Sequence, residues 1–336
     1  MSTTAAVIGC GDVSSVHFGA LASMDDARLV AVCDADPGRL EAAVAAHGVP
    51  GYANHLDLLE KVRPDVVHVC TPHHLHASIA ADCLERGINV IVEKPLAHTQ
   101  EAGRRLIEAA ERSPAKIAVC FQNRYNATSQ AMRRMLDDGR LGQVLGASAT
   151  VMWHRSGDYY RDRPWRGTWA EGGGGLMMNQ AIHTVDLLQW LVGDVAKVEG
   201  RAATRSLGGV IEVEDTAEFA AEHESGARSV FYATLANAVN APVTLDIITE
   251  AATLSLRGDL TVSYADGSVE VIPERVLETG GRSYWGVSHE LLIKDFYATL
   301  DDPAPFWISP AEAAKSLRIV KEIYAQSYPE LSERVG

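Results

Sequence analysis

Three polar residues follow a run of four glycines at intervals that fit one face of a helix. Gly172 to Gly175 precede Asn179, His183 and Asp186, and side chains three or four residues apart are neighbours on a helix. Histidine has an unperturbed pKa of about 6.5, so it can accept a proton near neutral pH. We expect the glycines to let the helix begin close to a bound ligand. The segment is a candidate for acid–base chemistry; a structural core histidine is the alternative.

A glycine-rich turn near the N-terminus has the spacing of a dinucleotide-binding loop. Gly9-Cys10-Gly11-Asp12-Val13-Ser14 follows an apolar run and carries serine where the Gly-x-Gly-x-x-Gly fingerprint has its third glycine. The first glycine of such a turn permits a sharp bend, and the second lets a pyrophosphate approach the N-terminus of the next helix. We therefore expect a dinucleotide here, with an ordinary glycine turn as the alternative.

An acidic residue completes this pattern. Asp34 ends the second apolar run, about 20 residues after the turn, where a carboxylate can bind the adenosine ribose. Its charge repels a 2′-phosphate, so the sequence favours NAD over NADP. Arg39 keeps NADP as the less favoured alternative.

The elements that must position these residues alternate along the first third of the chain. Apolar runs (AAVIG, RLVAVCD, DVVHVC, INVIVEK) alternate with helical patterns, which predicts a parallel sheet wrapped by helices. From about residue 195 the pattern changes to alternating strands, typical of an antiparallel sheet with one covered face. We predict an α/β chain with a Rossmann domain over residues 1–122 and a substrate-binding and oligomerisation domain over 123–336.

Composition excludes several classes of protein. The 336 residues suit about two domains, and acidic residues outnumber basic ones by 44 to 30, which disfavours nucleic acid as a partner. We expect no membrane partner, because no long apolar stretch is present. The N-terminus lacks the features of a secretion signal, and the five cysteines form no Cys-x-x-Cys pair. These features predict a cytoplasmic protein with reduced thiols and no bound metal.

Several motifs together resemble the Gfo/Idh/MocA family of nicotinamide-dependent oxidoreductases. They are GCGDVS with His17 behind it, Asp34, TPHHLH at Thr71 to His76, VEKP ending at Pro95, FQNRYN at Phe121 to Asn126, and the stretch from Gly172 to Asp186. The resemblance implies an N-terminal Rossmann domain. It also implies a C-terminal α/β domain built on a large, mostly antiparallel sheet, which carries the substrate site and often the oligomer interface.

The same resemblance implies the roles of the reacting residues. Lys94 and His183 match the lysine and histidine that handle the substrate hydroxyl in the family, and oxidising a secondary alcohol requires a base for the hydroxyl proton. His183 is the expected base, and Lys94 is expected to orient or polarise the oxygen. Asn179 stands where many relatives have aspartate; an asparagine can donate and accept hydrogen bonds but cannot accept a proton.

The remaining site residues follow from the motifs. For the cofactor they are Gly9, Gly11, Asp12, Val13, Asp34, Arg39, Thr71, Pro72, His76, Glu93 and Gln122. For the substrate they are Arg124, Tyr160, Trp165, Arg166, Asn179 and Asp186. His73, His74 and His76 lack a nearby cysteine or carboxylate that would complete a metal site, so we expect them to line the cofactor cleft or the protein interior.

A segment from Trp153 to Trp169 suggests the class of substrate. It combines four arginines with five aromatic residues; aromatic faces suit sugar C–H surfaces, and guanidinium groups suit carboxylates or phosphates. A sugar, sugar acid, inositol or nucleotide-linked sugar is the natural interpretation, and an interface or core loop is the alternative. Farther on, Tyr284, Trp285 and His289 lie beside a helical pattern, and a pocket or a structural role is open for His289.

Three functions compete at this point. The first is an NAD-dependent dehydrogenase that acts on a secondary alcohol of a sugar-like substrate. The second is a glycoside hydrolase that keeps NAD bound, and the third is a non-catalytic NAD-binding regulator, which the presence of Lys94 and His183 disfavours. A homodimer or homotetramer is expected, because an exposed sheet face in the second domain can pair with another copy.

Overall fold

The computed structural model describes residues 2–274 and 287–331 and divides the chain into two compact units. The described part of the first unit comprises residues 2–122 and 287–314, and that of the second comprises residues 123–274 and 315–331. Residues 287–314 thus pack with the N-terminal unit, whereas the sequence groups them with the C-terminal domain. The division into a cofactor domain and a substrate domain stays a prediction.

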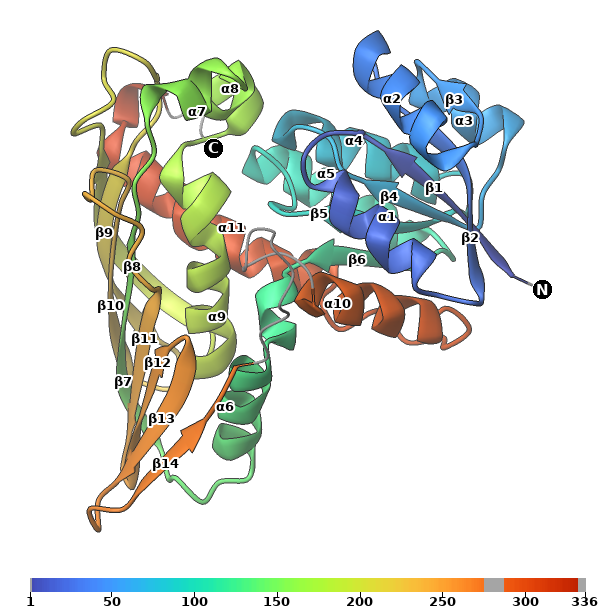
Figure 1. The fold of residues 1–336 in the computed structure, drawn as a ribbon. Coiled ribbons are helices and arrows are strands. Elements are labelled where there is room, and N and C mark those ends of the chain that lie inside the picture. Colours follow the sequence, from blue (N-terminus) through green and yellow to red (C-terminus); the bar gives the residue numbers. More distant parts are fainter. Residues whose placement is uncertain (1, 275–286, 332–336) are drawn as a thin grey trace. The chain divides into compact units, whose positions relative to one another are not determined.

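The first unit is built on a six-stranded sheet with the order β3-β2-β1-β4-β5-β6, in which every neighbouring pair is parallel (Figure 1). Its strands are β1 Thr3–Ile8, β2 Ala27–Cys33, β3 Gly51–Tyr52, β4 Val66–Val69, β5 Asn89–Glu93 and β6 Ile117–Cys120. Its helices are α1 Ser14–Ala22, α2 Pro37–His47, α3 His55–Lys61, α4 His73–Leu84, α5 Gln100–Arg112 and α10 Val287–Ala298.

Long-range contacts explain why residues 287–314 belong to this unit. Helix α10 packs on α1, and the Tyr297 hydroxyl lies 2.9 Å from Nε2 of His68 in the middle of β4. The Val119 N–H of β6 donates to the Ile308 carbonyl at 3.0 Å. Such contacts depend on the folded chain, so local periodicity does not predict them.

The second unit is built on an eight-stranded sheet with the order β14-β13-β12-β11-β7-β10-β9-β8. Only β7 and β10 pair in parallel among these strands; the other pairs are antiparallel. The strands are β7 Val144–Met152, β8 Val195–Ala203, β9 Thr216–His223, β10 Arg228–Thr234, β11 Thr244–Thr249, β12 Ala252–Arg257, β13 Asp259–Tyr264 and β14 Val269–Ile272. The predicted fold class, a Rossmann sheet followed by a mostly antiparallel sheet, is confirmed.

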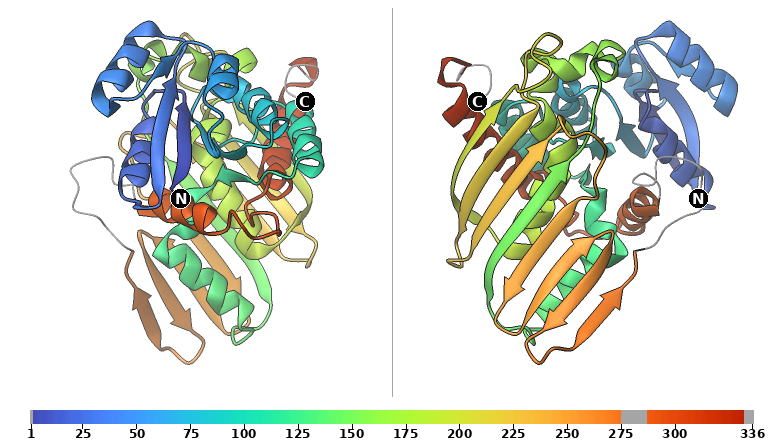
Figure 2. Two further views of the ribbon diagram at one scale, coloured as in Figure 1. Left: turned by 90° about the vertical axis from the view of Figure 1, so that its right-hand side faces the viewer. Right: turned by 60° about the vertical axis from the view of Figure 1, so that its left-hand side comes forward.

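Helices of the second unit cover one face of this sheet. They include α6 Ala127–Asp137, α9 Ile182–Val192 and the part of α11 Pro310–Ser327 from residue 315 onward. Short helical segments precede or follow them: η1 Gln122–Tyr125, α7 Gly157–Arg161, η2 Pro164–Gly167, α8 Trp169–Gly172, the π-helical turn η3 Met177–Ala181, and η4 Pro329–Leu331. The right-hand view of Figure 2 shows the strands in front and these helices behind them.

The opposite face of the eight-stranded sheet exposes apolar side chains. Val230 and Tyr232 on β10 and Ile248 on β11 are 40–56% exposed, and only β7 lies between these two strands. The alternate residues of the same strands are buried, so the period-2 pattern separates a core face from an apolar outer face. Among the described helices, none combines the length and the apolar character that crossing a membrane requires.

Candidate active site

The glycine turn of the first unit has the geometry that a pyrophosphate needs. Gly9 has a φ of +92°, and a Cβ at this position would lie 2.6 Å from the carbonyl carbon and oxygen of Cys70, so only glycine fits. A Cβ on Gly11 would meet no atom within 4 Å. The Ser14 hydroxyl donates to the Gly11 carbonyl at 2.6 Å at the start of α1. The space beside Gly11 and the helix N-terminus therefore suit an anionic group.

Four donors surround the Asp34 carboxylate at the end of β2. The backbone N–H groups of Cys10 and Asp36 each donate to it at 2.8 Å, and Arg39 donates through Nε and Nη2 at 3.0 Å each. Burial alone would raise the pKa of Asp34, but Arg39 and the backbone N–H groups outweigh burial and hold the pKa below its usual value. The carboxylate is therefore ionised and fixed beside the glycine turn, where its charge opposes a 2′-phosphate.

Several buried polar atoms of the first unit have no hydrogen-bond partner within the described chain, and two of them lie directly after parallel strands. These two are Oγ1 of Thr71, just after β4, and Oε1 of Gln122, just after β6. Buried polar atoms are almost always paired, so these two atoms at the carboxyl edge of the sheet fit contacts to a bound cofactor. His76 differs, because its two ring nitrogens each lie 2.8 Å from a backbone carbonyl, one of Thr71 and one of Pro95.

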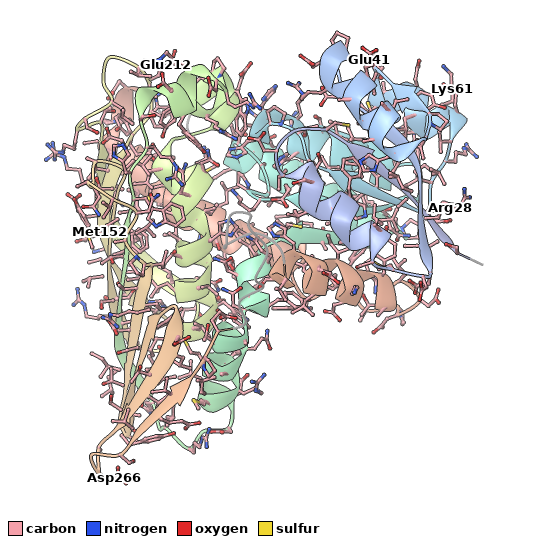
Figure 3. All side chains as sticks on the ribbon, in the orientation of Figure 1. Arg28, Glu41, Lys61, Met152, Glu212 and Asp266 are labelled. Carbon is pink, nitrogen blue, oxygen red and sulfur yellow. The ribbon has the colours of Figure 1, made fainter. Side chains whose placement is uncertain are left out.

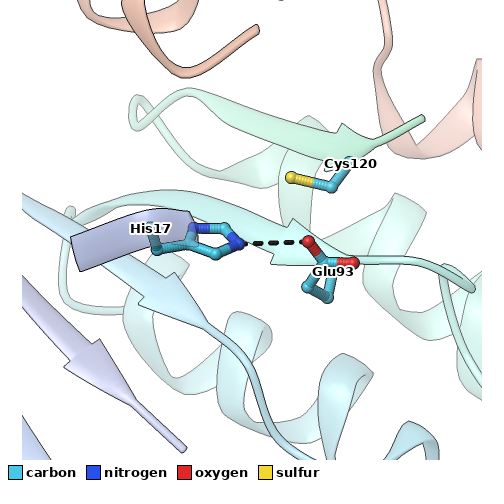
Figure 4. Close-up of side chains that lie close together, drawn as sticks. All are labelled: His17, Glu93 and Cys120. Atoms are coloured by element: carbon cyan, nitrogen blue, oxygen red, sulfur yellow. Dashed lines mark hydrogen bonds and ion pairs between the residues drawn. The ribbon is translucent and has the colours of Figure 1, made fainter. Parts of the chain in front are cut away.

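Strand β5 ends in a buried carboxylate followed by a lysine. Glu93 is 4% exposed, and its Oε1 accepts a hydrogen bond from Nε2 of His17 at 3.0 Å (Figure 4). The same oxygen accepts one from Nε2 of His289 at 3.3 Å. Burial would raise the pKa of Glu93, but the two histidines outweigh it and hold the pKa well below its usual value. Lys94, the next residue, is partly exposed, because successive side chains of a strand point to opposite sides.

A chain of hydrogen bonds continues from this carboxylate into the interior. His17 Nδ1 lies 2.9 Å from His68 Nδ1, and His68 Nε2 lies 2.9 Å from the Tyr297 hydroxyl. Burial lowers the pKa of His68 well below its usual value, and His17 adds to the effect. With both imidazoles neutral, one direction satisfies every atom: Tyr297 donates to His68, His68 to His17, and His17 to Glu93. The chain therefore needs no charge other than that of Glu93.

Cys120 approaches the same cluster. Its Sγ and the ligand atoms of His17 and Glu93 all lie within 4.8 Å of one another (Figure 4). Burial raises the pKa of the Cys120 thiol well above its usual value, and the Glu93 carboxylate adds to the effect. A neutral thiol beside a carboxylate that already accepts two histidine N–H groups is a packing arrangement, and we assign it no metal.

In the second unit, Asn179 and His183 are partly exposed at the junction of η3 and α9. The Asn179 side-chain amide donates to the Tyr159 hydroxyl at 3.1 Å, and that of Gln180 donates to the same oxygen at 3.0 Å. The first helical turn is a π turn, and such turns occur frequently at functional sites. On another side of α9, Val185, Leu188 and Val192 are buried.

Asp186 lies deeper in this unit than the sequence suggests. It forms a two-point ion pair with Arg124, with Nε–Oδ2 at 2.7 Å and Nη2–Oδ1 at 2.8 Å, and both side chains are 1% exposed. The Ser316 hydroxyl also donates to Asp186 at 2.9 Å, and the Arg124 guanidinium lies over the Trp190 ring. These two residues bind each other, so a direct contact with substrate remains a prediction for both.

The glycine run packs against protein rather than clearing space for a ligand. Residues Gly172–Gly175 are buried. A Cβ on Gly174, whose φ is +149°, would collide with the Tyr324 ring, and one on Gly175 would collide with the Glu214 carbonyl. The Tyr324 hydroxyl donates to the Glu214 carboxylate at 2.7 Å. Close packing, which needs residues without a side chain, explains the run, and a ligand beside the start of this helix stays a prediction.

Two buried titratable residues fix the backbone of the run. The Glu214 carboxylate accepts hydrogen bonds from the N–H of Gly175 at 2.8 Å and of Met177 at 2.7 Å. Lys321 Nζ donates to the Gly173 carbonyl at 2.9 Å. Burial raises the pKa of Glu214 and lowers that of Lys321 to about 7. The start of the helix that carries Asn179 is thus held by two interior groups.

The aromatic and arginine-rich segment begins directly after Met152, the last residue of β7 (Figure 3). Tyr160 is 2% exposed and lies in the interior, whereas Tyr159 contacts Asn179. The Arg166 guanidinium lies 4.5 Å from the Tyr159 ring centroid and 5.6 Å from that of Trp165. Arg166 and Trp165 are partly exposed. Tyr284 and Trp285 lie outside the described residues.

Comparison with known proteins identifies the family. Residues 3–121 match the oxidoreductase family with an NAD-binding Rossmann fold, and residues 129–255 match the GFO/IDH/MocA C-terminal domain. The chain belongs to the Gfo/Idh/MocA family. Its first unit is therefore an NAD-binding Rossmann fold, which confirms the predicted cofactor class.

Several members of the family resemble this chain. D-apiose dehydrogenase of Paraburkholderia graminis is 32% identical over 67% of this chain, and inositol 2-dehydrogenase 2 of Saccharopolyspora erythraea is 30% identical over 67%. The chain spans 58% and 65% of the lengths of these two relatives. The crystal structure of the WlbA dehydrogenase of Chromobacterium violaceum, in complex with NADH and UDP-GlcNAcA, is 31% identical with a TM-score of 0.85. That comparison covers 98% of this chain and 94% of the other.

Sequence reasoning missed two parts of this Gfo/Idh/MocA site. One is the interior chain from Glu93 to Tyr297; the polar His68 within the otherwise apolar run DVVHVC is a signal that such a strand needs a buried partner. The other is Tyr159, because two adjacent tyrosines on a short helix cannot be told apart by composition. The structure distinguishes them by contact with Asn179 and by burial.

Proposed function

We propose that the protein is an NAD-dependent dehydrogenase that acts on a secondary alcohol of a sugar, sugar acid, inositol or nucleotide-sugar. One observation carries the proposal: the carboxyl edge of the parallel sheet brings the Gly9–Gly11 turn, Thr71 and Lys94 together on neighbouring strands. Ligands bind at this edge in open α/β sheets. The named relatives, which act on apiose and inositol, support the substrate class.

The residues present fit NAD. The open space beside Gly11 suits the pyrophosphate, the Asp34 carboxylate suits the ribose hydroxyls, and the unpartnered Oγ1 of Thr71 and Oε1 of Gln122 can take up further polar groups. Asp12, Val13, Pro72 and His76 are proposed to line the same cofactor. When bound, the nicotinamide accepts the hydride from the alcohol carbon.

His183 is proposed to remove the hydroxyl proton. Oxidation of a secondary alcohol breaks the O–H and C–H bonds of one carbon and leaves a carbonyl, so the proton needs an acceptor. Lys94 donates to the same oxygen and stabilises the charge that develops as its proton leaves. Asn179 directs its amide toward Tyr159 and holds that hydroxyl. Trp165 and Arg166 are proposed to contact the substrate, and Arg124 and Asp186 to support α9.

The exposed apolar face of the eight-stranded sheet supports a homodimer or homotetramer. Val230, Tyr232 and Ile248 lie on β10 and β11, on either side of β7, and clustered exposed apolar residues mark interaction surfaces. Light scattering in solution tests the assembly. The wild type should have the mass of a dimer or tetramer, and Val230→Glu should shift that mass toward the monomer. A wild type with the mass of a monomer would contradict the proposed assembly.

We place the protein in the cytoplasm, because all five cysteines are free and reduced thiols persist there.

NADH formation from NAD tests the activity. The purified protein is mixed with NAD and a panel of inositols, aldoses, uronic acids and uridine-diphosphate sugars, with NADP in parallel. A rise in NADH absorbance with one class of substrate is the expected result. NAD binding without NADH formation from any substrate would contradict the dehydrogenase, and aglycone release from chromogenic glycosides would then identify an NAD-retaining hydrolase rather than a regulator.

A further inference from the structure

A positioned cation, Arg155, lies over the ring of Tyr159, the residue whose hydroxyl contacts Asn179 in the second unit. Arg155 Nη1 donates to the His154 carbonyl at 2.7 Å and to Asn240 Oδ1 at 3.0 Å. Its guanidinium lies 5.1 Å from the Trp153 ring centroid and 5.4 Å from the Tyr159 ring centroid. No carboxylate in the described part of the chain pairs with it, although the chain carries a net charge of −14. Because neutral oxygens accept its hydrogen bonds, the positive charge of Arg155 can pair with an anionic ligand.

The backbone that carries Arg155 is fixed within its own unit. The His154 N–H donates to the same Asn240 oxygen at 3.0 Å, and Trp153 Nε1 donates to the Ala241 carbonyl at 3.1 Å. His154 forms an isolated bridge with Ala236. The guanidinium is therefore preorganised, so a ligand would not have to immobilise a long side chain.

The Tyr159 hydroxyl offers a donor at the same place. It accepts hydrogen bonds from Asn179 and Gln180, which use both of its lone pairs. Its own O–H has no acceptor among the residues that the structure describes. The guanidinium groups of Arg155 and Arg166 lie over its ring. A hydroxyl that can only donate, beside two cations, suits an anionic acceptor.

We propose that Arg155 and Tyr159 bind a carboxylate carried by the sugar substrate. This inference rests on the proposed function and narrows the substrate class to acidic sugars. A planar carboxylate matches the guanidinium fork and also accepts the phenolic hydrogen. A neutral hydroxymethyl group at the same position would leave the cation without a counter-charge. The phosphates of a nucleotide-sugar also carry negatively charged oxygens, and the test distinguishes phosphate binding from carboxylate binding.

Calorimetry in the presence of NADH tests the subsite without requiring turnover. The ligands are two pairs that differ in one carboxylate: glucuronate with glucose, and UDP-GlcNAcA with UDP-GlcNAc. The wild type should bind the acidic member of at least one pair roughly 10- to 100-fold more tightly, as expected for hydrogen bonds to a charged group. Equal binding within both pairs by the wild type would overturn the proposal.

Variants then test whether Arg155 and Tyr159 cause the preference for acidic ligands. Arg155→Gln should remove it and Tyr159→Phe should reduce it, while Arg155→Lys retains part of it. The controls are Arg161→Gln, whose exposed side chain already pairs with Asp158, and Tyr264→Phe, whose hydroxyl donates to Glu270 at 3.0 Å at the end of β13. Both controls should keep the full preference. An unchanged preference in Arg155→Gln would overturn the assignment.

Further results distinguish carboxylate binding from phosphate binding, and the subsite from the proposed dehydrogenase activity. If Arg155→Gln weakens UDP-GlcNAc as much as UDP-GlcNAcA, the arginine binds phosphate and the carboxylate assignment is wrong. If the wild type binds acidic sugars selectively but forms no NADH from them, the dehydrogenase proposal fails while the subsite stands. If NADH forms from neutral sugars with the same kcat/KM as from acidic ones, the subsite fails while the dehydrogenase stands.

Discussion

The Glu93 carboxylate accepts a hydrogen bond from His17 Nε2 at 3.0 Å, one residue before Lys94. This contact joins α1 to the end of β5 and fixes the backbone directly before Lys94. The first unit thus couples the helix that follows the dinucleotide turn to the proposed catalytic lysine.

Glu93→Gln should lower stability, because it removes the charge that two buried histidine N–H groups face. Hydrogen bonds to a charged group contribute about 1.5–3 kcal/mol each, so the loss should be of that order. Because the folded-state pKa of Glu93 is depressed, its contribution is present above the unfolded-state pKa of about 4.3 and is lost as the pH falls toward the folded-state value. Urea unfolding at several pH values checks this, with the exposed Glu101→Gln as control. A variant as stable as the wild type at pH 7 would contradict the role of Glu93.

Arg124→Ala and Asp186→Ala should each destabilise the protein by about 3–5 kcal/mol, because each leaves a buried charge unpaired. The double variant should lose less than the sum of the two. Arg257→Ala removes an ion pair to Asp246 whose arginine is 51% exposed, so its effect should stay below about 1 kcal/mol. Additive losses in urea unfolding would show that Arg124 and Asp186 do not act as a pair.

Stability should depend on Lys321 in the alkaline range. Burial lowers its folded-state pKa to about 7, whereas an unfolded lysine titrates at about 10.4. Between these values the unfolded chain holds a proton that the folded chain lacks, so the free energy of unfolding rises with pH. The wild type should gain stability relative to Lys321→Met from pH 7 to pH 10, by a few kcal/mol at the order-of-magnitude level. Lys197→Met, at an exposed position, should show no such trend; a constant difference between wild type and Lys321→Met would refute the assignment.

Cofactor choice should respond to Asp34 and Arg39 in opposite ways. Asp34→Ala removes the carboxylate that opposes a 2′-phosphate and releases Arg39 to bind one, so NADP should bind more tightly and NAD roughly 10- to 100-fold more weakly. Arg39→Ala should leave NAD binding near the wild-type value and weaken NADP further. Titration of each variant with both cofactors checks this, and an unchanged NAD to NADP ratio in Asp34→Ala would show that another residue sets the choice.

Local sequence patterns predicted most of the fold. The apolar runs of the first third became parallel strands, and the alternating runs after residue 195 became the antiparallel sheet. These features depend on neighbouring residues alone, because strand and helix periodicities are local. The Gly9 turn was predictable for the same reason, since one residue type fits its backbone.

The rest of the site depends on partners distant in the chain. By spacing, Asp186 shares a helical face with His183. In the structure it forms a buried ion pair with Arg124. The spacing of residues along one helix cannot predict that partner. The π turn at residues 177–181 arises where Glu214 binds the backbone of the glycine run. Local reasoning assigned these glycines to a ligand because it could not foresee the Tyr324 ring.

Transfer of isotope from sugar to cofactor tests the central claim most directly. A sugar that supports NADH formation is deuterated at the carbinol carbon and incubated with NAD and wild-type protein, and the released cofactor is analysed by mass spectrometry. We predict deuterated NADH in solution in step with the oxidised sugar, and a rate lower by roughly 10²- to 10⁴-fold in Lys94→Ala at unchanged NAD affinity. NADH without deuterium, or deuterium that returns to the sugar with none released, would contradict a dehydrogenase.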